Sequence, residues 1–152
     1  MRILIVNPNT TASMTRTIEA AAQNAASART QIVALNPDTG PQSIQGRDDG
    51  EAALPGLYEL FECVVMNTGG YDAMIIACFD DTGLAELRSR SPIPVIGIGE
   101  AAYHQAADTA APFSVVTTLS VSVPILTENI AASDLTGQCA GVRASGVPVL
   151  DI

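Results

Sequence analysis

Short apolar runs recur along this chain, and each is followed by a polar corner and then by a helix-like stretch. The segment RILIV at residues 2–6 ends at a polar loop, which is typical of a strand buried on both faces of a parallel sheet. Comparable runs occupy residues 30–35, 73–77, 94–98, 113–117 and about 141–144. Strands that alternate with helices in this order predict an α/β fold, in which helices flank a parallel sheet.

The stretches between these runs have a composition that favours helices. An Ala-rich segment from about Ser13 to Ala28 predicts the first helix, with Thr11 as its N-cap. A longer helix is expected from about Asp49 to Asn67, interrupted near Pro55. Further helices are expected at residues 84–90, 100–107 and about 120–131.

Length and composition exclude several classes of protein. A chain of 152 residues, 47% hydrophobic and 15% charged, can bury the core of one ordinary domain and is not disordered. Seven basic against sixteen acidic residues give a net charge of −9, so no basic patch for a nucleic acid is expected. No apolar run approaches the ~18 residues of a membrane span, and RILIV is too short for a signal peptide. We therefore expect a cytoplasmic protein with neither a nucleic-acid nor a membrane partner.

The carboxyl ends of the predicted strands are the place to look for a site, because ligands of parallel α/β sheets bind there. Four polar corners follow predicted strands: residues 7–11, 78–82, 97–100 and 117–118.

Cys78 stands in the second of these corners, in the sequence ACFDDTG. A thiol at a strand end and near a helix N-terminus is favoured as thiolate, which can act as a nucleophile or as a base toward carbon acids. The neighbouring Asp80 and Asp81 act the other way, because carboxylates raise the pKa of a thiol. The alternative for Cys78 is a small buried residue that only fills space at the strand end.

Amide and hydroxyl side chains occupy two other corners. Asn7, Asn9 and Thr10, together with free helix N–H groups, could hold a carboxylate or an imide oxygen. Thr117 and Thr118 could form an oxyanion cradle after the fifth strand. Turn formation and helix capping account for both corners as well.

The remaining candidate residues are interpreted as structural. His104, the single histidine, lies on a predicted helix, so no Ser–His–Asp or Cys–His relay is expected. The glycines of GIG at residues 97–99 lack the third glycine and the distal acid of a dinucleotide fingerprint, and predict a tight strand-to-helix turn. Cys63 and Cys139 show no metal-ligand spacing. We expect Cys63 in the core or at an interface, and Cys139 as a structural thiol.

Taken together, the segments MRILIVNPNTT, ACFDDTGL, PIPVIGIGEAA, FSVVTT and VRASGVPVLDI resemble the hydantoin and allantoin racemases of the aspartate/glutamate racemase superfamily. The resemblance runs through the whole chain, in order. It implies two pseudo-symmetric α/β half-domains, here residues 1–98 and 99–152, with the second incomplete and the active site in the cleft between them.

The resemblance also implies racemisation of a 5-substituted hydantoin or allantoin by two cysteines, one on each face of the α-carbon, without a metal or any other cofactor. Cys78 matches the first cysteine, and substrate contacts are expected from Asn7, Asn9, Thr10, Phe79, Asp80, Thr117 and Thr118. The chemistry is reasonable, because a thiolate can remove the acidified C5 proton while donors hold the enolate oxygen.

The second catalytic cysteine of the family lies downstream of a VRASGVPVLDI-like segment. Cys139 precedes that segment and is not assigned this role. We therefore expect an N-terminal portion of a racemase, in which two-sided racemisation fails while one-sided proton exchange can survive. Apolar surface left uncovered predicts a homo-oligomer. The alternatives are an inactive remnant that binds a small ligand or associates with itself, and a related cysteine-dependent isomerase or decarboxylase.

Overall fold

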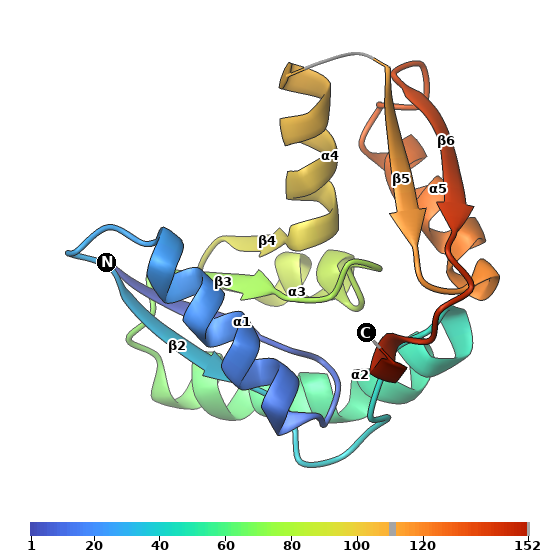
Figure 1. Cartoon of the computed structure of the whole chain (residues 1–152). Helices are drawn as coiled ribbons and strands as arrows, with labels where there is room; N and C mark the ends of the chain where they lie inside the picture. The colour runs from blue at the N-terminus through green and yellow to red at the C-terminus, as the bar shows by residue number, and fades with distance from the viewer. Residues whose placement is uncertain (110–111, 152) are drawn as a thin grey trace.

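The computed structural model describes residues 1–109 and 112–151, and its larger sheet has four parallel strands. These are β1 (Arg2–Val6), β2 (Gln31–Leu35), β3 (Ala73–Ile76) and β4 (Val95–Gly97), in the order β2-β1-β3-β4. β1 pairs with both β2 and β3, and β3 pairs with β4. Each strand lies where the sequence predicted one, and the parallel sheet is confirmed (Figure 1).

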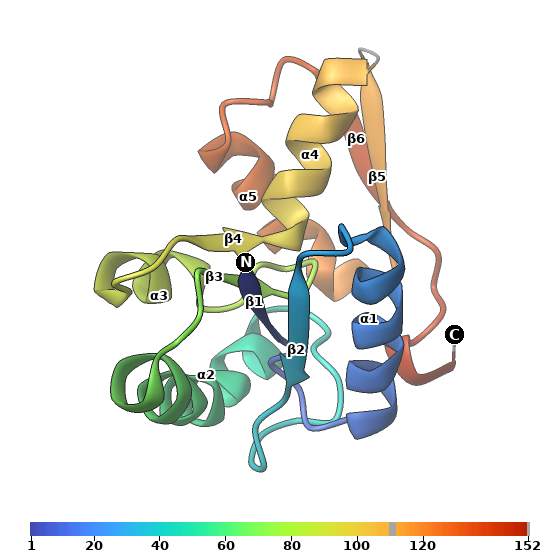
Figure 2. The same cartoon turned by 90° about the vertical axis from the view of Figure 1, so that its left-hand side faces the viewer.

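Helices cover both faces of this sheet, as Figure 2 shows. Helix α1 (Ala12–Ala25) lies on one face. Helix α2 (Arg47–Phe61), its π-helical continuation (Glu62–Thr68) and α3 (Leu84–Arg90) lie on the other. The predicted arrangement of helices flanking a parallel sheet is therefore confirmed.

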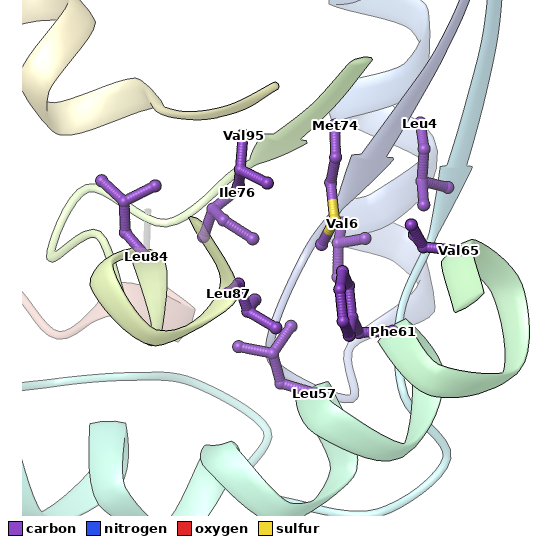
Figure 3. Packing of buried hydrophobic residues seen from close by; sticks show 10 residues of the cluster. All are labelled: Leu4, Val6, Leu57, Phe61, Val65, Met74, Ile76, Leu84, Leu87 and Val95. Carbon is purple, nitrogen blue, oxygen red and sulfur yellow. The ribbon is translucent and has the colours of Figure 1, made fainter. Parts of the chain in front are cut away.

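The main core lies between the sheet and α2 with α3 (Figure 3). Alternate residues of β1 and β3 point into it, as the two-residue period of a strand requires. The cluster consists of Leu4, Val6, Leu57, Phe61, Val65, Met74, Ile76, Leu84, Leu87 and Val95. At ~1.5–3 kcal/mol for each fully buried large apolar side chain, this cluster fixes the carboxyl ends of β1 and β3 firmly in place.

A smaller unit follows the larger sheet in the chain and lies beside it (Figure 1). It comprises α4 (Ile98–Thr109), β5 (Phe113–Thr117), a 3-10 turn (Ser120–Ser122), α5 (Val123–Ala132) and β6 (Cys139–Ala144). β5 and β6 form a two-stranded parallel sheet. Its core consists of Tyr103, Val115, Leu126, Ile130 and Leu135. The division into half-domains at residue 98 stays a prediction, with α4 beginning at that residue.

Three expectations about helices are wrong. Helix α2 runs through Pro55 without a break. Pro55 is exposed while Ala53 and Leu57 pack inward, so water can satisfy the carbonyl that loses its partner at the proline. Thr11 occupies the N-cap position of α1 without capping it, because its hydroxyl donates to the carbonyl of Gln42 at 2.6 Å. The same helix ends at Ala25, three residues earlier than expected.

Candidate active site

A cavity of about 170 Å³ lies at the carboxyl ends of β1, β3 and β5, between the two sheets. Its walls come from the corners after these strands, from α1 and from three loops. The lining residues are Asn7, Asn9, Met14, Ile44, Ala77, Cys78, Phe79, Asp80, Thr117, Thr118, Ser122 and Val149. Corners that are more than 100 residues apart in the sequence therefore meet in one place.

The cavity brings together all but one of the side chains that the sequence singled out for the site. Cys78 and six of its seven predicted companions line it. Thr10 is not among the lining residues, and its hydroxyl donates to the carbonyl of Pro41 at 3.2 Å. Thr10 thus holds the loop that follows β1, whereas the roles of the other residues stay predictions.

The two asparagines of the first corner differ in the hydrogen-bond donors that they leave free for a ligand. The amide nitrogen of Asn7 donates to Asn9 Oδ1 at 2.9 Å and to Thr15 Oγ1 at 3.0 Å, so its donors are used within the protein. Asn9 Oδ1 also accepts the N–H of Thr11 at 2.9 Å. The amide nitrogen of Asn9 has the sulfur of Met14 as its partner, at 3.2 Å. Because a thioether is a weak acceptor, Asn9 keeps a donor that a ligand can take.

The threonine pair closes the opposite side of the cavity. The carbonyls of Thr117 and Thr118 accept the N–H groups of Ser145 and Gly146, both at 2.8 Å, where the chain leaves β6. Within residues 1–109 and 112–151, neither threonine hydroxyl has a hydrogen-bond partner. Capping does not use them either, because no side-chain cap is formed at the helical turns that follow. Both hydroxyls are therefore available to a ligand.

Cys78 begins the loop that connects β3 to α3. Its sulfur lies 3.4 Å from Thr82 Oγ1. The next residues tie this loop to the smaller unit: Ser122 Oγ donates to the carboxylate of Asp80 at 3.4 Å, and Asn129 Nδ2 donates to the carbonyl of Asp80 at 2.9 Å. The thiol is thus held at the boundary between the two sheets.

Comparison with known proteins identifies the family of this chain. The model of the family described as Asp/Glu/Hydantoin racemase matches residues 3–152. The chain belongs to this family. The family resemblance noted in the sequence is thereby confirmed.

Individual members of the racemase family agree over nearly the whole chain. It is 39% identical over 151 residues to the hydantoin racemase of Pseudomonas sp. (strain NS671), covering 99% of this chain and 60% of that protein. It is 41% identical over 150 residues to the hydantoin racemase of Rhizobium meliloti, covering 99% and 61%. The solved structure of the allantoin racemase from Klebsiella pneumoniae superposes with a TM-score of 0.93 at 39% identity, covering 99% and 60%. The chain thus spans about 60% of the length of these relatives.

Burial sets the charge state of the candidate thiol in this racemase-family chain. Removal from solvent and, to a smaller extent, the carboxylate of Asp80 raise the pKa of Cys78 to about 11, against the opposing effect of the Thr82 hydroxyl and of the N–H groups of Asp80 and Thr82. The expectation that the strand-end position favours thiolate is therefore wrong for the free chain. The main reason is desolvation, which disfavours the charged form. The predicted opposing effect of Asp80 is present, whereas Asp81 is not among the main causes of the shift.

The cavity offers a ligand hydrogen bonds without a positive charge. Among the described residues that line it there is no lysine, arginine or histidine. Its one ionisable carboxyl group is that of Asp80, whose pKa burial raises against the effect of the Gly46 N–H and the Ser122 hydroxyl. A neutral ligand with both N–H and C=O groups suits such a lining better than a carboxylate ion does.

Several lining residues were missed by the sequence reasoning. Met14 lies in the first turn of the helix after the Asn corner, so helical spacing could have found it. Ser122 was placed only within a helix, and its contact with Asp80 has no local signal. Ile44 comes from the loop before α2, and Val149 begins a 3-10 turn (Val149–Asp151), where its N–H donates to Gln45 Oε1 at 3.0 Å. Long-range contacts of this kind do not follow from periodicity.

The other singled-out residues lie outside the cavity. Cys63 is exposed on the π-helical turn, so the expectation of a core position is wrong, and the alternative of an interface stays a prediction. Cys139 is partly buried and packs against the smaller core, as expected of a structural thiol. His104 is exposed on α4. The glycines at residues 97 and 99 form the predicted strand-to-helix turn.

No group of three or more His, Cys, Asp or Glu side chains within the described residues could hold a metal ion. None of the helices in that part of the chain is long and apolar enough to cross a membrane.

Proposed function

We propose that this chain carries the Cys78 half of the active site of a cofactor-independent racemase that acts on a 5-substituted hydantoin or on allantoin. The observation that carries the proposal is the position of Cys78 in a cavity lined by the asparagine and threonine corners. Similarity to hydantoin racemases and to an allantoin racemase supports the same substrate class.

The lining favours a neutral cyclic ureide over an amino acid. An amino-acid carboxylate would find no cationic side chain in this cavity and would lie near Asp80. A hydantoin ring is uncharged and presents N–H and C=O groups, which the Asn9 amide and the two threonine hydroxyls can pair. Ile44 and Phe79 offer apolar contacts for the substituent at C5.

In the reaction that we propose, Cys78 exchanges the proton on one face of C5. The thiolate takes that proton, the electron pair moves into the adjacent carbonyl, and Thr117 and Thr118 stabilise the enolate oxygen by hydrogen bonds. A thiol with a pKa of about 11 is a strong base once ionised, but only a small fraction is ionised near neutral pH. Neither Cys63 nor Cys139 lines the cavity, so the described residues provide one thiol for one face.

The decisive experiment follows a single enantiomer of a 5-substituted hydantoin in D₂O, with C5 deuteration read by NMR and optical rotation read in parallel. We expect deuteration with retained rotation. Cys78→Ser should abolish deuteration, and Cys63→Ser, which changes an exposed thiol away from the cavity, is the matched control.

Each other outcome has a definite meaning. Loss of rotation together with deuteration would show that a second proton donor reaches the other face, contrary to the one-sided reaction proposed. Absence of deuteration at every pH would overturn the catalytic proposal. If the hydantoin still bound in that case, measured by calorimetry, the chain would be an inactive ligand-binding member of the family.

We further propose that the chain forms a homo-oligomer in the cytoplasm and takes a small molecule, not a nucleic acid, as its partner. Exposed Ile96 and Ile98, at 43% and 38%, lie on and next to the edge strand β4 and support association. Three free thiols suit a reducing compartment. Light scattering coupled to size exclusion should give a mass above one chain, and Ile96→Lys should lower it.

A further inference from the structure

The carboxylate of Asp81 is bound by the first turn of α4. Asp81 Oδ1 accepts the N–H of Gly99 at 2.9 Å, and Oδ2 accepts the N–H of Glu100 at 2.7 Å. These N–H groups belong to the helix end, where they have no partner within the helix. Burial raises the pKa of Asp81 to about 6, so the group is mostly ionised at neutral pH and the two hydrogen bonds are charge-assisted.

Two glycines make room for this carboxylate. A Cβ atom at Gly97 would collide with Asp81 Oδ1. A Cβ atom at Gly99 would lie 2.7 Å from Asp81 Oδ2 and 2.5 Å from the carbonyl oxygen of Phe79. Neither glycine has a positive φ, so backbone conformation does not exclude a side chain at these positions. Close contacts exclude it, from the Asp81 carboxylate at both glycines and also from the Phe79 carbonyl at Gly99. The GIG segment is thereby explained as the receptor of the Asp81 carboxylate.

The same residue organises the loop that begins at Cys78. The N–H of Asp81 donates to the carbonyl of Cys78 at 3.0 Å, and the carbonyl of Asp81 accepts the N–H of Leu84 at 3.1 Å. Asp81 itself has a φ of +51°, an uncommon conformation for a residue with a side chain, which the surrounding contacts must hold in place. Two successive turns therefore meet at Asp81, and its side chain anchors both to α4.

We propose that the contact of the Asp81 carboxylate with Gly99 and Glu100, which we call the Asp81 latch, makes Asp81 a positioning residue for the Cys78 thiol. The latch holds the loop so that the sulfur stays in the cavity wall beside Thr82. This proposal rests on the proposed function, because it takes Cys78 as the reacting thiol. Asp81 is not among the main groups that shift the Cys78 pKa, so a tenfold change in Cys78 labelling after substitution of Asp81 reports mainly a change in position.

Site-specific alkylation of the whole chain tests the latch without relying on turnover. Iodoacetamide labelling of Cys78 is followed by peptide mass spectrometry from pH 7 to pH 11.5, with Cys139 as the internal monitor of unfolding. In Asp81→Asn, labelling of Cys78 at pH 8 should rise by about tenfold, the effect of losing a charge-assisted hydrogen bond. Its pH profile should move from about 11 toward the ordinary thiol value of 9.0, with Cys139 labelling unchanged.

Matched variants separate positioning from general loss of stability. Gly97→Ala, whose added Cβ atom would meet the Asp81 carboxylate first, should act like Asp81→Asn, and the double variant should exceed the stronger single variant by less than about twofold, because both break the same contact. Glu100→Gln keeps the backbone N–H that binds Asp81. Gly137→Ala adds a methyl group where nothing lies within 4 Å. Both controls should label like the unmodified chain.

Two results would overturn the proposal. One is a folded Asp81→Asn chain in which the labelling rate and pH profile of Cys78 stay as they were. The second result comes from amide hydrogen exchange of the unmodified chain, so it does not depend on whether the variant folds. The amides of Gly99 and Glu100 should exchange at rates within about tenfold of that of the Asp81 amide, because the latch makes these residues open as one unit. Exchange of Gly99 and Glu100 at the rate of free amides, with the Asp81 amide still protected, would exclude the latch.

Discussion

The sulfur of Cys78 lies 3.4 Å from the hydroxyl oxygen of Thr82, four residues further along the same loop. This contact lowers the pKa of the thiol, which burial nevertheless raises to about 11. Thr82 is itself buried, so its hydroxyl has little competition from water. Together with the N–H groups of Asp80 and Thr82, this hydroxyl favours the thiolate of Cys78 against the desolvation of the cavity.

Replacement of Thr82 by valine should therefore make Cys78 less reactive. Without the hydroxyl the thiolate loses a donor, and its pKa should rise by about half to one unit, which corresponds to a hydrogen bond of ~0.5–1.5 kcal/mol. Alkylation of Cys78 at pH 8 should slow by roughly three- to tenfold. Thr82→Ser keeps the hydroxyl and should stay within about twofold of the unmodified chain. Equal rates in the valine and serine variants would contradict the role of this hydrogen bond.

The raised pKa of Cys78 should also appear as a loss of stability in alkali. The folded-state pKa of about 11 lies above the ordinary value of 9.0, so the folded state holds its proton longer than the unfolded state. The contribution of this protonated thiol to the free energy of unfolding is fully present below about pH 9 and is lost as the pH rises toward 11. Urea unfolding at pH 8, 9.5 and 10.5 should show a smaller loss for Cys78→Ser than for the unmodified chain. Parallel curves for the two proteins would argue against a partly buried, neutral thiol at Cys78.

The strands of this chain were predictable because each is an apolar run that ends at a polar corner. The segments at residues 2–6, 73–77 and 113–117 gave the position of three strands whose carboxyl ends surround the cavity. A rule about parallel sheets then pointed to four corners, of which those at residues 7–11, 78–82 and 117–118 contribute to the cavity, Cys78 among them. That rule depends only on the direction of the strands, so it needs no knowledge of side-chain contacts.

Contacts between segments that are distant in the sequence could not be predicted in this way. The attachment of Asp81 to Gly99 and Glu100 has no periodic signal, and the glycines of GIG were explained only as a turn. The pKa of Cys78 was misjudged for the same reason, because its burial depends on packing against the main core between the sheet and α2 with α3. Helix rules based on local sequence were wrong at Pro55, which is exposed and does not break the helix. They were also wrong at Thr11, whose hydroxyl binds a neighbouring loop and does not cap the helix.

The core between the sheet and α2 predicts where substitution is most costly. Phe61 is fully buried between β1 and β3 side chains, and Phe61→Ala should lower the free energy of unfolding by ~3–5 kcal/mol through lost burial and a cavity. Val116, which is 69% exposed on β5, is the control, and Val116→Ala should stay within about 0.5 kcal/mol. Urea denaturation followed by circular dichroism measures both. A cost for Phe61→Ala below about 1 kcal/mol would show that the sheet face repacks or is not closed by α2.

The difference between Asn7 and Asn9 yields a prediction about binding. Asn9→Asp keeps the oxygen that accepts from Asn7 and from the N–H of Thr11, but removes the amide donor and adds a negative charge near Asp80. Hydantoin affinity should fall by about tenfold or more, since a neutral ligand loses a donor and gains an unpaired acceptor opposite its carbonyl. The fold should persist, because the structural contacts need only the oxygen. Calorimetric titration with the hydantoin, beside a thermal melt, measures the two effects separately.

Asn7→Ala should show the reverse pattern, a clear drop in melting temperature, since Asn7 is almost fully buried and both its amide hydrogens are used within the protein. Unchanged affinity in Asn9→Asp would remove Asn9 from the ligand contacts and leave the threonine pair as the donors to the substrate.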